Sequence, residues 1–132
     1  MKCQIEFCPN PNVVEIHVNQ RLIQGSVLYF ECSADSSEIG KEFKKQAINA
    51  DNLLNFCKTV SELDGMEGEI LFDRYTIQLS KASMFSWDEV LPHILNALQT
   101  FIAKDNTLEE SGPAKRLTEE ELHILRQQGC KV

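Results

Sequence analysis

The sequence lacks the short motifs that mark common enzyme classes and metal sites. None of its five cysteines stands in a C-x-x-C pair, and its six glycines form no phosphate-binding loop followed by Lys-Ser or Lys-Thr. It contains neither a G-x-S-x-G nucleophile elbow nor an H-E-x-x-H zinc motif. We therefore expect a protein with no enzymatic activity, no resident cofactor and no bound metal.

Positive charge and long apolar runs are also scarce. Thirteen Lys and Arg residues stand against 20 Asp and Glu residues, which gives a net charge of −7 and argues against nucleic acid as a partner. No run approaches the ~18 apolar residues of a membrane span, and none near the N-terminus has the length of a secretory signal. These features predict a cytoplasmic protein that contacts no membrane.

The cysteines are odd in number and scattered, which favours reduced thiols over a disulfide framework. Cys32 and Cys57 fall on apolar faces, where cysteine packs as a small hydrophobic side chain. Cys8 directly precedes a proline-rich turn and is the candidate for an exposed, reactive thiol, although no base or helix N-terminus adjoins it in the sequence. Cys130, near the C-terminus, has no evident role.

Histidine is the other residue type that catalysis or metal binding most often uses. His17 lies on the polar side of an expected strand beside Glu15, and His93 lies on the polar side of an expected helix. His123 belongs to the C-terminal tail. Because none has a ligand partner at a recognisable metal spacing, we interpret all three as ordinary surface histidines.

Period-two alternation predicts the strands. The clearest is 13–18, which alternates Val14, Ile16 and Val18 with Glu15 and His17. Strands are also expected at 4–7 and 26–32, and a hairpin at 69–72 and 75–79 whose turn lacks the favoured Asn-Gly sequence.

Helical periodicity and capping residues predict the helices. A short helix is expected from the spacing of residues 39, 43 and 47, and a second from an N-cap at Asp51 to about residue 63. Ser86 and Glu89 form a capping box at the start of an apolar stripe that runs to about residue 103.

Residues 105–113 are polar and include Gly-Pro, which is typical of a linker, and Thr118 with Glu121 opens a short helix in the tail. We predict an α+β domain at 1–103, with a small antiparallel or mixed sheet and helices packed mainly on one face. Residues 104–132 would then form a linker and a short helical tail.

Several segments together resemble the N-terminal domain of the Nfu (NifU-like) iron–sulfur cluster scaffold proteins, over roughly residues 4–103. The resemblance rests on the order of the segments as well as on their letters. In chain order they are Pro9, Asn10, Pro11 and Asn12 before a strand; Leu63, Asp64 and Gly65 before a hairpin; the strand at 75–79; and Trp87 and Asp88 followed by Val90, Leu91 and Pro92 in a long helix.

In that family a C-terminal domain carries C-x-x-C pairs, which from two subunits bridge a cluster that is delivered to client proteins. The N-terminal domain is thought to modulate partner recognition. The present sequence has no C-x-x-C pair, has Cys8 where the family usually has threonine, and is longer at 33–50. The resemblance therefore implies a non-enzymatic accessory or protein-interaction module of cluster assembly or delivery, which binds assembly proteins or client apoproteins and holds no C-x-x-C-bound cluster.

Two interpretations of Pro9, Asn10, Pro11 and Asn12 stay open: a tight turn that sets strand register, and an exposed, rigid partner-binding loop. Two other functions also stay open. One is a small thiol-dependent redox or metal-handling protein that uses Cys8. The other is a stand-alone binding module, unconnected with cluster assembly, whose tail helix around 118–128 docks the partner.

Overall fold

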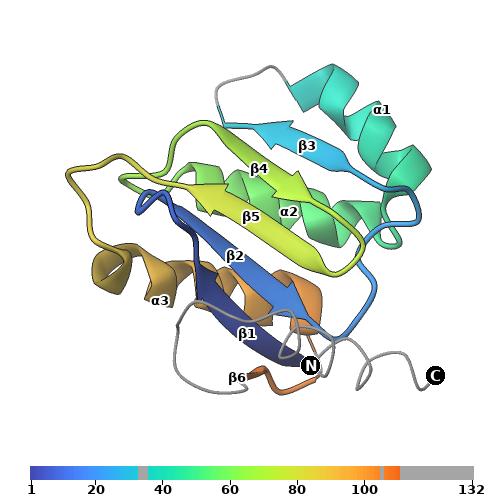
Figure 1. The fold of residues 1–132 in the computed structure, drawn as a ribbon. Helices are drawn as coiled ribbons and strands as arrows, with labels where there is room; N and C mark the ends of the chain where they lie inside the picture. The colour runs from blue at the N-terminus through green and yellow to red at the C-terminus, as the bar shows by residue number, and fades with distance from the viewer. Residues whose placement is uncertain (33–35, 105, 111–132) are drawn as a thin grey trace.

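The structure, a computed structural model, describes residues 1–32, 36–104 and 106–110, and it has an α+β fold. In Figure 1, α2 and α3 lie behind the sheet, and α1 packs beside its β3 edge. The described elements are β1 (Lys2–Phe7), β2 (Val13–Val18), β3 (Leu28–Glu31), α1 (Ser36–Gln46), α2 (Ala50–Ser61), β4 (Glu69–Phe72), β5 (Thr76–Ser80), α3 (Trp87–Ala97), the π-helical η1 (Leu98–Ala103) and β6 (Glu109–Glu110).

The sheet is mixed, with strand order β3-β4-β5-β2-β1-β6. Every neighbouring pair is antiparallel except β1 and β6, which are parallel. At the middle of the sheet Ile16 of β2 pairs with Ile5 of β1 on one side and Ile77 of β5 on the other. The predicted fold class is confirmed.

The alternation predicted for β2 separates two environments. Val14, Ile16 and Val18 are fully buried on the face that the helices cover. Glu15 and His17 point to the opposite face, because successive residues of a strand point to opposite sides of the sheet. The helix-covered face holds the core.

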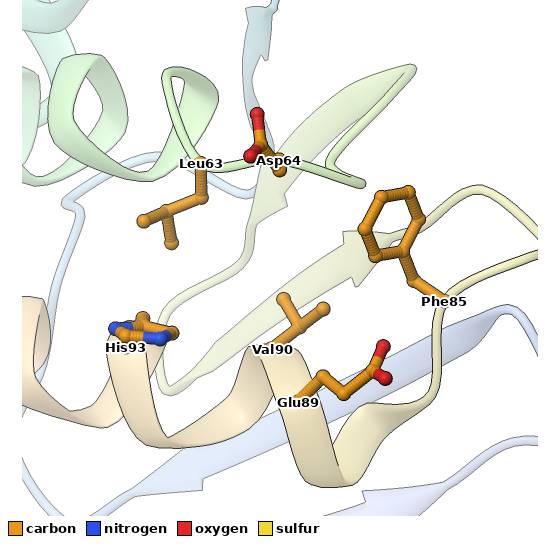
Figure 2. Close-up of a pocket in the computed structure, with 6 residues that line it drawn as sticks. All are labelled: Leu63, Asp64, Phe85, Glu89, Val90 and His93. Carbon is orange, nitrogen blue, oxygen red and sulfur yellow. The ribbon is translucent and has the colours of Figure 1, made fainter.

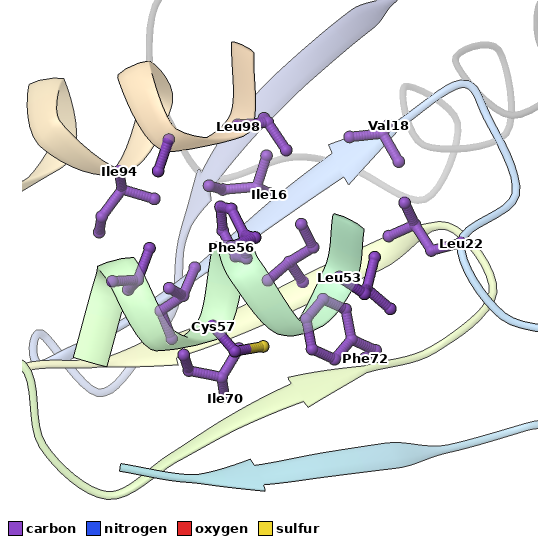
Figure 3. Close-up of a cluster of buried hydrophobic side chains, with 14 of the residues drawn as sticks. Ile16, Val18, Leu22, Leu53, Phe56, Cys57, Ile70, Phe72, Ile94 and Leu98 are labelled. Atoms are coloured by element: carbon purple, nitrogen blue, oxygen red, sulfur yellow. The ribbon is translucent and has the colours of Figure 1, made fainter. Parts of the chain in front are cut away.

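Three phenylalanines link the helices to the sheet within that core. Phe43 of α1 and Phe56 of α2 each meet the Phe72 ring of β4 edge to face, at centroid distances of 6.0 and 6.4 Å. Figure 3 shows Phe56 and Leu53 of α2 directed at the sheet, beside Phe72. Because all three rings are fully buried, this contact joins α1, α2 and the sheet in one core.

The ends of α2 and α3 depend on side-chain caps. The predicted N-cap Asp51 is wrong: Asn49 caps α2, and its Oδ1 accepts a hydrogen bond of 3.2 Å from the Asn52 amide. Asp51 instead lies in the first turn, where its negative charge interacts favourably with the helix dipole. The capping box predicted for α3 at Ser86 and Glu89 is present.

The hairpin turn and the segment after α3 complete the described chain. The Asp73 carboxylate accepts from the Tyr75 amide at 2.9 Å, which closes the β4–β5 turn without Asn-Gly. Within the segment interpreted as a linker, β6 pairs Glu109 with Lys2 and Glu110 with Cys3. The predicted tail helix, His123 and Cys130 lie outside the described residues.

Replacing Phe72 with alanine tests the central position of the aromatic contact. We expect Phe72→Ala to lower the free energy of unfolding by about 3–5 kcal/mol, because it leaves a cavity that α1 and α2 both line. Urea denaturation measures this loss. Tyr29→Ala, at an exposed aromatic on the neighbouring edge strand, is the control and should change stability by less than ~0.5 kcal/mol. Equal losses in the two variants would contradict the assignment.

Candidate functional site

The loop between β1 and β2, residues 9–12, is a tight turn closed by its own asparagine. Asn10 Oδ1 accepts from the Asn12 amide at 3.0 Å, and the Asn10 carbonyl accepts from the Val13 amide at 3.1 Å. Pro9 and Pro11 have no amide hydrogen to donate, and their rings fix φ. The 9–12 loop is therefore a tight turn between two paired strands, which agrees with the first of the two open interpretations.

Two residues far along the chain also hold this loop through hydrogen bonds to its inner side. Trp87 Nε1 donates to the Pro11 carbonyl at 2.9 Å. Lys81 donates twice to Asn12, from its amide to the carbonyl at 2.9 Å and from Nζ to Oδ1 at 3.0 Å. Lys81 Nζ also lies 5.5 Å from the centre of the Trp87 ring, within cation–π range. We call Lys81 and Trp87 the anchor of the loop.

The anchor is buried while much of the loop is exposed. Lys81 is only 6% exposed and Trp87 8%, whereas Pro9, Asn10 and Pro11 are exposed. A loop whose backbone is held from inside, with Pro9, Asn10 and Pro11 exposed, suits recognition of another protein. The geometry thus accommodates both interpretations of this segment.

A pocket lies between the end of α2 and the start of α3. Its volume is about 350 Å³, and Figure 2 shows its six lining residues: Leu63, Asp64, Phe85, Glu89, Val90 and His93. Gly65 borders it at φ +92°, where a β-carbon would stand 2.6 Å from the Phe85 ring, so glycine is required there. His93 is exposed at its rim, as predicted.

Backbone hydrogen bonds connect this pocket to the loop. The Lys81 amide donates to Asn12, and the next amide, of Ala82, donates to the Gly65 carbonyl at 2.7 Å. In Figure 1 the β1–β2 loop, the α2–β4 turn and the start of α3 lie at one end of the molecule. The chain thus brings together segments separated by more than 50 positions in the sequence.

The structure places the described thiols in different environments. Burial raises the pKa of the Cys57 thiol well above its ordinary value, with Cys32 adding to the rise, and burial also raises the pKa of Cys32. Both belong to the core or pack against it, as predicted. Cys8 was expected to be exposed but is partly buried at the start of the loop, and its amide donates to the Val13 carbonyl at 3.3 Å.

His17 corrects the sequence interpretation, because it is not a surface histidine. Its side chain is 2% exposed, and Nε2 lies 2.9 Å from Glu6 Oε1 and 3.4 Å from Glu15 Oε2. On the other side of the ring, Nδ1 lies 3.0 Å from Thr76 Oγ1. The sequence shows Glu15 two residues before His17, but Glu6 joins them only because β1 pairs Glu6 with Glu15. Spacing along the chain could not reveal this partner, whereas the hairpin register would have.

Comparison with known protein families and with curated protein sequences gives no match. Among solved structures, the X-ray structure of protein SAV1430 from Staphylococcus aureus, a structural genomics target, is similar to this chain. The identity is 19% and the TM-score 0.51, over 74% of this chain and 99% of SAV1430. At this identity the likeness concerns the fold.

One further observation concerns membranes. Of the helices within residues 36–104, none combines the length and the apolar character that crossing a bilayer would need.

Removing the indole donor tests the anchor. We expect Trp87→Phe to lower the free energy of unfolding by about 1–2 kcal/mol, because the Pro11 carbonyl loses its donor while most of the ring volume stays. Amide exchange at Asn12 and Val13 should accelerate more than exchange in β4. Tyr29→Phe removes a polar group from an exposed aromatic ring and is the matched control, with no expected change in stability. Unchanged exchange in the loop would show that the anchor does not hold it.

The buried thiol of β1 generates a pH dependence. Burial, with a smaller contribution from Glu110 against the N-terminus, raises the pKa of Cys3 to about 12. The unfolded chain has a thiol pKa of roughly 8.5, so the unfolded state loses this proton first as the pH rises. The stability that the neutral thiol contributes is therefore complete below pH ~8.5 and is lost as the pH rises towards ~12.

We therefore expect the stability advantage of the wild type over Cys3→Ala to shrink between about pH 8 and pH 10.5 in urea denaturation. Val18→Ala, at the strand partner of Cys3, removes a side chain that does not titrate, so its stability deficit should stay constant over the same range. Parallel trends in the two variants would refute the assignment of the pH dependence to Cys3.

Proposed function

We propose that this chain is a non-enzymatic protein-interaction module of iron–sulfur cluster assembly or delivery. Its partners are assembly proteins or client apoproteins, and the 9–12 loop is the surface that meets them. The resemblance to the N-terminal domain of Nfu proteins supports the pathway. The geometry of the loop supports the surface.

A single observation carries the proposal: the segments on which the resemblance rests meet in space. Trp87 of one segment donates a hydrogen bond to Pro11 of another. Gly65 of a third accepts from Ala82, the neighbour of the anchor residue Lys81. Because these segments contact one another in the fold, their joint presence in the sequence reflects one structural unit. Segments that did not touch could match the family separately by chance.

The rigidity of the loop favours recognition energetically. Binding a partner orders the side chains and loops of an interface, and a loop fixed beforehand avoids much of that entropic cost. Proline residues reduce the freedom of the unbound loop further. An exposed loop that is fixed on its inner side therefore gives up little entropy when a partner covers it.

The test compares loop variants for binding to purified partners. We expect Pro9→Ala combined with Pro11→Ala to weaken binding to a purified cluster scaffold protein or a cluster-requiring apoprotein at least tenfold, measured by biolayer interferometry. The Pro11 carbonyl and its hydrogen bond to Trp87 survive this change, so the fold should stay intact. Ile48→Ala is the control, at an exposed apolar residue between α1 and α2. An equal loss in the control would remove the loop from the interface, and no saturable binding to any such protein would overturn the pathway.

Anaerobic incubation of the same preparation with iron and sulfide tests whether the chain itself holds an iron–sulfur cluster. We expect no stoichiometric cluster to survive desalting, as judged by visible absorption. A stable cluster would contradict a module that only recognises partners. Thiol chemistry at Cys8 would instead be revealed by a Cys8→Ser variant that retains partner binding but loses reactivity towards a disulfide reagent.

A further inference from the structure

We propose that Glu6, Glu15 and His17 form a binding site for one divalent first-row transition-metal ion. We call these three residues the β1–β2 triad. The triad lies on the sheet face opposite the helices, and its ligand atoms all lie within 4.8 Å of one another. The proposal does not depend on the proposed interaction function, because it concerns different residues and a different ligand.

The spacing of the ligand atoms suits a metal ion. With metal–ligand bonds of ~2.1 Å, neighbouring ligand atoms are roughly 3.0 Å apart in octahedral and 3.4 Å apart in tetrahedral coordination. His17 Nε2 lies 2.9 Å from Glu6 Oε1 and 3.4 Å from Glu15 Oε2. Small side-chain adjustments would place all three atoms on one ion.

Thr76 provides the outer contact that metal-binding histidines usually have. When Nε2 binds a metal ion, the remaining ring proton is on Nδ1, and a fixed acceptor there sets the orientation of the ring. Thr76 Oγ1 stands 3.0 Å from Nδ1 and can accept this hydrogen bond. The ring is therefore already held with Nε2 directed at the two carboxylates.

The backbone gives the triad little freedom. Glu6 pairs directly with Glu15 across β1 and β2, and His17 pairs with Thr76 across β2 and β5. All four residues thus stand on adjacent, hydrogen-bonded strands, which are more precise platforms than loops. The site exists as soon as the sheet has formed.

Burial differs across the triad in a way that admits an ion. The imidazole is 2% exposed, whereas Glu6 and Glu15 remain 19% and 30% exposed. An ion can therefore enter from solvent between the two carboxylates and reach the buried Nε2 of His17. Water would fill its remaining coordination positions. One imidazole with two carboxylates favours ions such as Zn²⁺, Fe²⁺, Co²⁺ or Mn²⁺ over Ca²⁺.

The competing occupant of the same position is a proton. An ionised carboxylate only accepts hydrogen bonds, so without a metal the contact between Nε2 and Glu6 requires a proton on Nε2. When a metal ion takes that position, the ring proton stands on Nδ1 instead, where Thr76 Oγ1 can accept it. Coordination at Nε2 therefore requires an acceptor at Nδ1, which loose attraction of a cation to the carboxylates does not.

The experiment titrates the chelator-treated full chain with Co²⁺ and Zn²⁺ alone, with no partner protein. We expect one ion per chain and, for Co²⁺, a visible ligand-field band. Glu15→Gln should weaken binding at least tenfold, and Thr76→Val should weaken it through the lost orientation of the ring. Glu69→Gln, on the distant strand β4 of the same sheet, is the matched control and should bind as the wild type does.

Two outcomes would overturn the proposal. One is the absence of saturable binding to a wild type whose circular dichroism is native. The other is equal affinity in Glu15→Gln and Glu69→Gln, which would assign the ion to other ligands. Glu15 is the main test because it is partly exposed and its isosteric amide should leave the fold intact, whereas replacing the buried His17 could disturb the sheet. Failure here leaves partner binding by the 9–12 loop unaffected, so the two proposals fail separately.

Discussion

The pairing of β2 with β1 and β5 is the constraint on which the rest of the structure depends. Ile16 has Ile5 on one side and Ile77 on the other, and this register directs Val14 and Val18 at the helices. A shift by one residue would move Val14, Ile16 and Val18 to the polar face and Glu15 and His17 into the core. The same register determines what the opposite face holds, because Glu15 and His17 alternate with these core residues.

One strand thus serves both proposed sites. The turn that precedes β2 is the 9–12 loop, and the polar face of β2 contributes two members of the β1–β2 triad. The loop is held by Lys81 and Trp87, which follow β5 in the sequence and are therefore placed by the β2–β5 pairing. Neither site could form if β2 were paired differently: the triad needs β1 and β2 together, and the anchor of the loop needs the start of α3 as well.

The sequence was informative wherever one local rule determined the outcome. Alternation identified β2 with its bounds, and the capping box identified the start of α3. It was less informative where two short polar residues competed for one role: Asn49, not Asp51, caps α2. The two residues of β6 are too few and too acidic to resemble a strand, and they pair only because β1 offers an edge. Local sequence patterns therefore identify most of the elements, whereas a short element such as β6 depends on the strand with which it pairs.

The candidate sites follow the same division. Pro9, Asn10, Pro11 and Asn12 were recognisable because prolines and asparagines punctuate a chain, but the support from Trp87 comes from a residue 76 positions away. His17 was misassigned because a polar residue on a strand is usually exposed, and its burial depends on neighbours in β1 and β5. The sequence could identify residues whose role depends on their neighbours in the chain. It could not identify roles that depend on a partner distant in the sequence.

The short acidic strand β6 has a consequence for how the molecule behaves in a crowded solution. An unprotected strand at the rim of a sheet presents unpaired amides and carbonyls that invite the same edge of another molecule. At one rim β6 pairs with Lys2 and Cys3 of β1 and presents Glu109 and Glu110 outward, both of them exposed. Beside the opposite rim, α1 packs against β3. These two edges therefore disfavour edge-to-edge strand pairing between copies of the molecule. The net charge of −7 also disfavours association, because like-charged copies repel one another.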